Sequence, residues 1–186
     1  MEDFLGRIAA EEQSPGGGSA AAVTVAMAAG LVAMVARCSK STWPDAPGVA
    51  AQALQIQKRT GPLASADASA WDEALDALRK AKEGEGTGDD AALQLRLERA
   101  AAVPLEIAQL AADVADLAAI AGERCEGTYQ ADAAAAAALA AGAARAALHL
   151  VEVNLGVREG DARLKQARAI EQAAAEASER VLGSIR

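Results

Sequence analysis

Residues 14–36 read SPGGGSAAAVTVAMAAGLVAMVA: three glycines, then a long uncharged run of small and apolar side chains. Alanine has the highest helix propensity of all residues, so the run from Ala20 to Ala36 predicts a helix that is apolar on every face. The run is too short and too rich in alanine for the roughly 20 strongly apolar residues that a bilayer requires. We therefore expect this helix at the centre of a soluble bundle or at an interface between two copies of the chain.

The composition of the whole chain favours helices as well. More than a quarter of the 186 residues are alanine and only 2% are aromatic. A β-sheet needs β-branched and aromatic side chains on its surface, and this chain has few of them. A hydrophobic content of 52% is ample for one continuous core. We predict an all-α fold, a single-domain bundle of about six helices over residues 1–186.

Glycine and proline mark where the helices begin and end. Two predicted helices contain a proline, Pro62 in one and Pro104 in the other, which removes a backbone N–H and is expected to kink the helix. Residues 83–88 form a glycine-rich loop before Asp89, a candidate N-cap, and Gly122 begins the next break. The predicted helices cover approximately residues 2–12, 19–40, 49–82, 89–121, 129–155 and 161–186.

Charge and cysteine content exclude several classes of protein. Acidic residues outnumber basic ones by 26 to 18, and the net charge of −8 repels phosphate backbones and anionic lipids. We therefore expect neither nucleic acid nor a membrane as a partner. Cys38, Cys125 and the single histidine show no metal-ligand spacing, so no metal is expected. Glu2 and Asp3 are the opposite of the cationic start of a signal peptide. We expect a reduced, cytoplasmic protein.

Gly16, Gly17 and Gly18 are the first unusual feature of the sequence. Three consecutive glycines lose much conformational entropy on folding, so some position there must need a backbone without Cβ. They precede a helix N-terminus, whose free N–H groups and positive dipole end attract an anion or a carbonyl oxygen. With Ser19 they form a candidate binding loop. A tight turn between two helices explains them equally well.

Asp67 is the second unusual feature. The apolar stripe of its predicted helix includes Leu63, Ala70 and Trp71, and Asp67 falls on the same side. A carboxylate on an apolar face carries a desolvation cost unless it has a partner, and burial raises its pKa toward the range useful for proton transfer. Asp67 is therefore a candidate catalytic acid or base. The alternative is a structural carboxylate paired with a helix cap or an arginine.

Asp132 and Asn154 are weaker candidates in the fifth predicted helix. Asp132 lies in its first turn, where a carboxylate is expected simply to complement the helix dipole. Asn154 lies near the other end of the helix and is a polar group at a C-terminus. Position alone assigns neither residue to a site.

Several of these residues belong to short motifs that follow one another along nearly the whole chain. The N-terminal motifs are Phe4-Leu5, Ile8-Ala9 and the segment from Ser14 to Ala22 before a long helix of small residues. The later motifs are Asp67-Ala68-Ser69-Ala70-Trp71, Val103-Pro104-Leu105, Asp132 after a loop, and Val153-Asn154-Leu155. In this order the motifs resemble those of the cyclodeaminase/cyclohydrolase family of folate enzymes.

The resemblance implies an all-α dimer that binds a tetrahydrofolate derivative. Members of the family either cyclise 5-formimidoyltetrahydrofolate to 5,10-methenyltetrahydrofolate with release of ammonia, or open the methenyl compound with water. Both reactions pass through a tetrahedral carbon between two folate nitrogens, so one carboxyl group can serve both without a metal or a redox cofactor. The resemblance implies that Asp67 is catalytic and that the substrate-binding residues are Gly16, Gly17, Gly18, Ser19, Asp132 and Asn154.

Several positions depart from the family pattern. Thr42 and Trp43 stand where a basic pair is usual, and Ser65 stands in place of an acidic residue. Glu126 begins a Glu-Gly pair where Gly-Asn is usual, and Ala131 stands where a serine is usual. The departures keep three alternatives open: the cyclodeaminase reaction, the cyclohydrolase reaction, and a helical binding or scaffold protein that keeps the fold without its chemistry.

Self-association is expected from the apolar helix over Ala20–Ala36. An uncovered apolar face of several hundred Å² corresponds to roughly 10 kcal/mol at about 25 cal/mol per Å², which is similar to the stability of a whole domain. A two-fold interface through this helix, or through the predicted helix over 129–155, would bury that face. We predict a homodimer with the active cleft near the interface.

Overall fold

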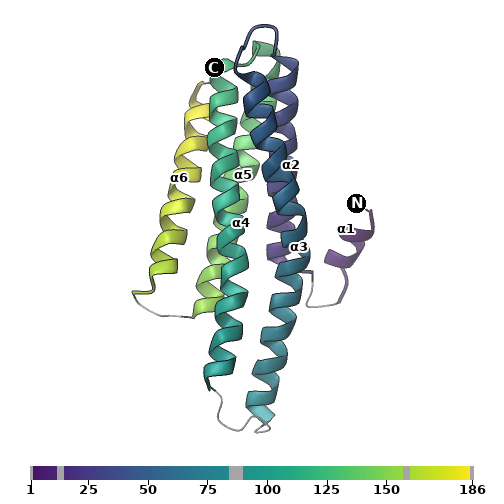
Figure 1. Ribbon diagram of the computed structural model, residues 1–186, viewed down its shortest axis with the longest axis vertical. Helices are drawn as coiled ribbons and strands as arrows, with labels where there is room; N and C mark the ends of the chain where they lie inside the picture. Colours follow the sequence, from purple (N-terminus) through teal and green to yellow (C-terminus); the bar gives the residue numbers. More distant parts are fainter. Residues whose placement is uncertain (1, 12–14, 84–89, 157–159, 185–186) are drawn as a thin grey trace.

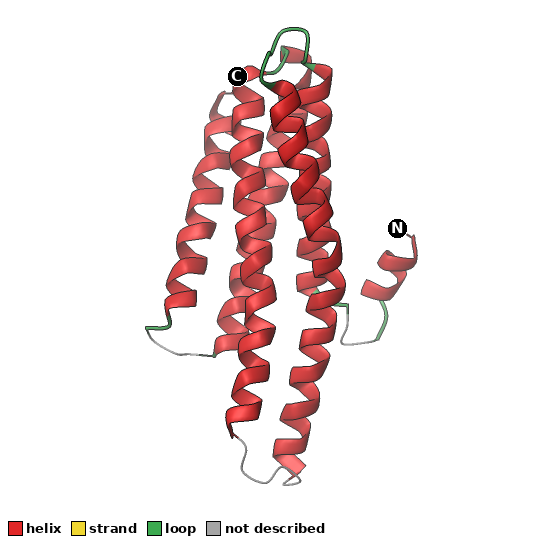
Figure 2. Cartoon of the chain, in the orientation of Figure 1, coloured by secondary structure: helices red, strands yellow, loops and turns green. Residues whose placement is uncertain are grey.

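Four long helices lie side by side and form the body of the protein (Figure 1). They are α2 (Gly17–Cys38), α3 (Ala46–Glu83), α4 (Asp90–Arg124) and α5 (Gln130–Leu155). The computed structural model describes residues 2–11, 15–83, 90–156 and 160–184. Within these ranges every regular element is helical, as Figure 2 shows, which confirms the all-α prediction.

The remaining elements are arranged around these four helices. α2 and α4 each pack against both α3 and α5, and α2 also contacts α4 across the centre. α6 (Ala162–Ser184) packs along α4 and α5, and a single 3-10 turn, η1 (Gly127–Tyr129), leads into α5. The short α1 (Glu2–Ile8) buries none of its residues and stands apart from the bundle in Figure 1. The outer side of the α2–α5 pair is therefore covered by no other helix of the described chain.

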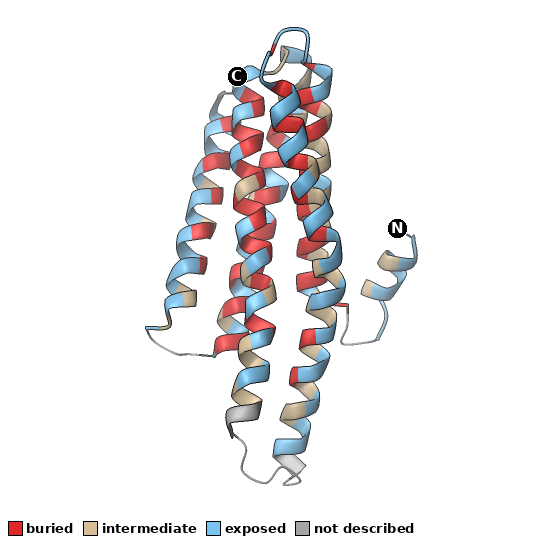
Figure 3. Cartoon of the chain, viewed as in Figure 1, coloured by how far each residue is buried: buried red, intermediate tan, exposed pale blue. Residues whose placement is uncertain are grey.

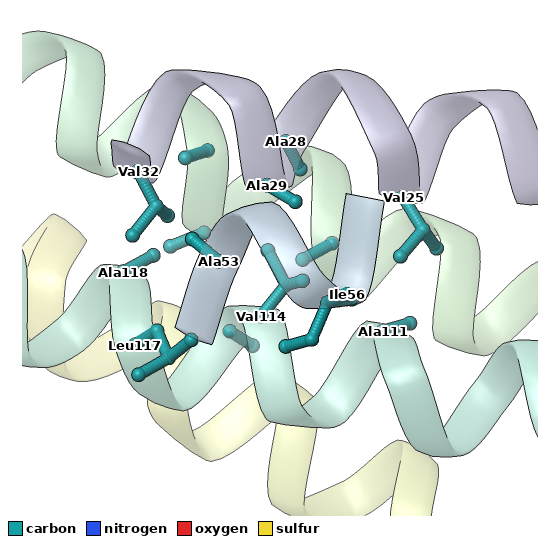
Figure 4. Close-up of a cluster of buried hydrophobic side chains, with 14 of the residues drawn as sticks. Val25, Ala28, Ala29, Val32, Ala53, Ile56, Ala111, Val114, Leu117 and Ala118 are labelled. Atoms are coloured by element: carbon teal, nitrogen blue, oxygen red, sulfur yellow. The ribbon is translucent and has the colours of Figure 1, made fainter. Parts of the chain in front are cut away.

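The core is built mainly from alanine and valine. Figure 4 shows Val25 and Val32 of α2 facing Ile56 of α3 and Val114 and Leu117 of α4, with alanines filling the space between them. Side chains this small let the helix backbones approach closely, so a dense interior forms mainly from aliphatic side chains, with Trp43 as a buried aromatic residue. Buried residues occur on the inward faces of the long helices, while the projecting ends of α3 and α4 are mostly exposed or only partly buried (Figure 3).

Several helix boundaries differ from the predicted ones. The predicted break at Gly122 is wrong, because α4 continues to Arg124. A Cβ at Gly122 would lie 2.9 Å from Val181 of α6, so glycine is present there for close helix packing and not as a helix breaker. α1 ends at Ile8, consistent with a short helix that lacks a packing partner. Of the predicted loop over 83–88, Glu83 is instead the last residue of α3. Residues 84–88 and the candidate N-cap Asp89 lie outside the described residues.

Two segments are long and apolar enough to cross a membrane by length and composition, namely Gly17–Cys38 and Gly127–Leu155. Of their most apolar windows, 56% and 50% respectively are buried inside the protein. The core helix of a bundle passes the same test, and both segments contribute to this core. The remaining residues of each window are partly buried or exposed.

Candidate active site

A cavity of about 220 Å³ lies where the start of α2, the middle of α3 and the end of α5 meet. Asp67 and Trp71 enter it from α3, and Asn154 enters it from α5. The full set of lining residues is Gly16, Gly17, Gly18, Asp67, Ala68, Trp71, Leu150, Val153 and Asn154. The structure thus brings together five of the seven predicted site residues, from three separate parts of the sequence.

The close approach of Asp67 explains the glycine at position 18. A Cβ added to Gly18 would collide with the Asp67 carboxylate. At Gly17, in contrast, a Cβ would make only an ordinary contact, 3.9 Å from Leu150. The first turn of α2 therefore needs a bare backbone at one position so that the α3 carboxylate can lie against it. A tight turn between helices does not account for this contact.

Ser19 lies behind the wall of the cavity. Its side chain is fully buried, and its hydroxyl donates a hydrogen bond of 2.6 Å to the carbonyl oxygen of Ala64 in α3. Its backbone N–H donates to the carboxylate of Asp67. Ser19 thus fixes the start of α2 onto α3 and holds Asp67 through the backbone, while its side chain takes no part in lining the cavity.

Burial governs the electrostatics of Asp67. Desolvation raises the pKa of this carboxyl above its ordinary value of 3.8, although the hydrogen bond from the Ser19 N–H lowers it in part. Among the described residues, no lysine, arginine or histidine forms an ion pair with it. Within the described part of the chain, the structural partner of Asp67 is therefore the N-terminus of α2 and not an arginine. A half-buried carboxyl with a raised pKa that faces a cavity is suited to proton transfer.

Asn154 is held by a contact with α4. The residue is only 8% exposed, and its Nδ2 donates a hydrogen bond of 2.7 Å to the carbonyl oxygen of Ala100. His149, one turn earlier in α5, is exposed and contacts Glu152 at 3.3 Å, and it does not line the cavity. Asn154 is therefore the polar group that α5 contributes to the site.

The apolar wall of the cavity comes mainly from residues that were not predicted as site residues. Trp71 follows Asp67 by four positions, and Leu150 precedes Asn154 by four, so each lies one helical turn from a predicted polar residue. This spacing was the signal that could have identified both. A flat aromatic or heteroaromatic ring fits such a wall, because it can contact Trp71 and Leu150 while its polar edge reaches Asp67 and Asn154.

Asp132 does not reach this cavity within one chain. It lies in the first turn of α5, 22 positions before Asn154, which corresponds to about 33 Å at 1.5 Å per residue. Its end of the bundle also holds Glu126, which accepts hydrogen bonds from Ser41 at 3.0 Å and Thr42 at 3.4 Å. The structure thus separates Asp132 from the other predicted site residues.

The positions that depart from the family pattern also lie outside the cavity. Thr42 and Glu126 contact each other at the Asp132 end of the bundle. Trp43 is a core residue that is 3% exposed, and Ser65 is an exposed residue of α3. None of these residues lines the cavity that contains Asp67.

The fold and the cavity define the class: a helical bundle with a cavity lined by one half-buried carboxyl. The family model described as formiminotransferase-cyclodeaminase matches residues 1–177. The chain therefore belongs to the formiminotransferase-cyclodeaminase family of folate one-carbon enzymes.

Individual relatives agree with this assignment. The chain is 31% identical over 163 residues to a methenyltetrahydrofolate cyclohydrolase of Methylorubrum extorquens, an alignment covering 83% of this chain and 78% of that protein. It also resembles the crystal structure of a formiminotetrahydrofolate cyclodeaminase from Thermotoga maritima, with a TM-score of 0.84 and 21% identity over 100% of this chain and 96% of the other. At that identity the second likeness concerns the fold alone.

Proposed function

We propose that the protein cyclises 5-formimidoyltetrahydrofolate to 5,10-methenyltetrahydrofolate with release of ammonia, and that Asp67 is its catalytic acid–base. The observation that carries the proposal is the position of Asp67, which lies half-buried against the α2 N-terminus in a cavity with an apolar wall. The cavity of about 220 Å³ is smaller than the roughly 300–1,000 Å³ of a site for a drug-sized ligand. It suits the reacting ring of a folate, with the rest of the substrate outside.

The proposed reaction needs one proton donor. N10 of the folate attacks the formimidoyl carbon, and the proton that N10 loses passes to the imine nitrogen, which gives a tetrahedral carbon bonded to N5, N10 and an amino group. Protonated Asp67 transfers its proton to this amino group, the C–N bond breaks, ammonia leaves, and the N5 lone pair completes the methenyl bond. The raised pKa of Asp67 keeps more of the acid form available near neutral pH than a free aspartate would. Proton transfer is the only chemistry required, so the mechanism uses no metal or redox cofactor.

The second candidate is the methenyl cyclohydrolase reaction, which is favoured by the 31% identity to a protein of that name. In this reaction water adds to the methenyl carbon, and the Asp67 carboxylate accepts the proton of the water. The C–N5 bond then breaks as the new hydroxyl gives its proton to water and N5 takes a proton from water, which leaves a formyl group on N10. The same carboxyl acts in both reactions, as an acid in the first and as a base in the second.

The experiment follows the methenyl chromophore and ammonia with purified protein and each substrate in turn. Formation of the chromophore with equimolar ammonia from the formimidoyl substrate supports the cyclodeaminase. Loss of the chromophore from the methenyl substrate, without activity on the formimidoyl compound, supports the cyclohydrolase. No change with either substrate at micromolar enzyme contradicts both and favours a binding or scaffold protein.

The proposal includes a cytoplasmic homodimer. The uncovered outer side of α2 and α5 carries exposed large apolar residues, among them Met27 at 45%, Leu139 at 38% and Val153 at 70%. Val153 also lines the cavity, so an interface on this side would cover the rim of the site. A two-fold contact between two copies would bury the apolar halves of both helices.

A further inference from the structure

Pro104 lies inside α4 and is fully buried. A residue at this position would normally donate its backbone N–H to the carbonyl oxygen four positions earlier, which is that of Ala100. Proline has no N–H, so the Ala100 carbonyl lacks its helical donor. Ala100 is itself buried, at 3% exposure, and a buried carbonyl without a donor is costly.

The missing donor is supplied by Asn154. Its Nδ2 lies 2.7 Å from the Ala100 oxygen, in an apolar setting formed by Ala101, Val151 and Leu155. Because a carbonyl oxygen only accepts, the nitrogen of the Asn154 amide must face α4. Its Oδ1 then points away from α4. Among the described residues, no polar side-chain atom that is buried lacks a hydrogen-bond partner, so an Oδ1 without a partner has to be accessible to solvent. Since Asn154 lines the cavity, its Oδ1 is the atom left for a ligand.

The other helix-interior proline shows what happens without such a contact. Pro62 of α3 has no N–H to donate to the carbonyl oxygen of Lys58, and both residues are exposed. Water can satisfy that carbonyl, and no side chain of the described residues is bonded to it. Only the buried proline thus creates an acceptor that has to be satisfied by a side chain of the site.

We propose that Pro104 is a positioning residue, which fixes the amide of Asn154 so that its Oδ1 accepts a hydrogen bond from an N–H group of the ligand. The proposal deepens the proposed function, on which the identity of the ligand as a pteridine rests. Pro104 itself does not line the cavity. It acts by leaving the Ala100 carbonyl free, and Asn154 transmits the effect.

The first test is independent of activity and uses the free protein. In the wild type, NMR of the Asn154 side-chain amide is expected to show protection from solvent exchange and a coupling across the hydrogen bond to the Ala100 carbonyl. In Pro104→Ala, the new N–H of residue 104 competes for that carbonyl, so exchange of the Asn154 amide is expected to rise about tenfold. An unprotected amide in the wild type overturns the proposal, even if the variant fails to fold.

The second test measures the affinity for a stable reduced folate, 5-formyltetrahydrofolate, in a double-mutant cycle. Pro104→Ala and Asn154→Ala are each expected to weaken binding about tenfold, the effect of roughly one hydrogen bond, and the double variant is expected to be no weaker than Asn154→Ala. Additive losses, or an equal loss in the matched control Pro62→Ala, would show that helix shape matters instead and overturn the proposal. The two proposals can fail separately. If neither the wild type nor any variant binds this folate, but the Asn154 amide is protected in the wild type and exposed in Pro104→Ala, the proposed function fails and the positioning of Asn154 by Pro104 stands.

Discussion

At the scale of single residues, the contact between Gly18 and Asp67 is the feature on which the site depends most. Because a Cβ at position 18 would collide with the Asp67 carboxylate, Gly18→Ala must displace the start of α2 or the side chain of Asp67. We expect a loss of about 1–3 kcal/mol in the free energy of unfolding together with a loss of activity. The matched control is Gly48→Ala in α3, where a Cβ would meet nothing within 4 Å. That variant is expected to gain about 0.5–1 kcal/mol, because alanine is the better helix former. Urea unfolding of both variants checks this prediction, and an unaffected Gly18→Ala would contradict the observed contact.

The raised pKa of Asp67 gives stability a dependence on pH whose sign is fixed. A carboxyl with a higher pKa in the folded than in the unfolded state binds more protons when folded, so the free energy of unfolding falls as the pH rises from about 3.8 through the folded pKa. Asp67→Asn removes this term. We therefore expect the variant to be more stable than the wild type at neutral pH, with the difference closing below about pH 3.8. Asp72→Asn, at an exposed position of the same helix, is the matched control. The opposite result would be a wild type whose free energy of unfolding rises relative to that of Asp67→Asn as the pH rises. That result would show that folding favours the charged form of Asp67.

At the scale of the helices, Gly122 and Val181 determine how closely α4 and α6 pack. A Cβ at Gly122 would lie 2.9 Å from a methyl group of Val181, so Gly122→Ala is expected to cost about 1–3 kcal/mol of stability despite the better helix propensity of alanine. Adding Val181→Ala should recover part of that loss, since it removes the opposing methyl groups. Thermal unfolding of the single and double variants measures the coupling, and strict additivity would rule out the steric explanation.

The helices could largely be predicted from the sequence, because alanine favours helix at every position and the glycine and proline segments separate the runs. Gly122 could not be interpreted correctly, since a glycine that permits helix contact looks the same in a sequence as one that ends a helix. In the site, Gly18 and Asp67 stood out because each is unusual in its own segment. Their contact could not be foreseen, since it depends on how α2 and α3 align. In contrast, the length of the predicted helix alone indicates that Asp132 and Asn154 lie too far apart to share one cavity within a chain.

At the scale of the whole molecule, the uncovered side of α2 and α5 determines the expected oligomer. The proposed dimer buries Met27, which is 45% exposed in the single chain, so Met27→Glu would place a charge in the interface. Light scattering is expected to give about twice the chain mass of 18.8 kDa for the wild type and the chain mass for this variant. Leu182→Glu, at an exposed position of α6 outside that side, is the matched control and should remain dimeric. A wild type with the mass of one chain at micromolar concentration would contradict the proposed interface.

The Asp67 carboxyl is proposed to transfer the proton in a folate one-carbon reaction. The most direct test is the initial rate of the change in methenyl absorbance, measured for the wild type, Asp67→Asn and Asp72→Asn. Asp72 is the matched control, because it lies on the same helix and faces solvent. We predict that kcat falls by roughly two to four orders of magnitude in Asp67→Asn, the usual contribution of a general acid–base group, and stays at the wild-type value in Asp72→Asn. Wild-type turnover in Asp67→Asn would contradict the account.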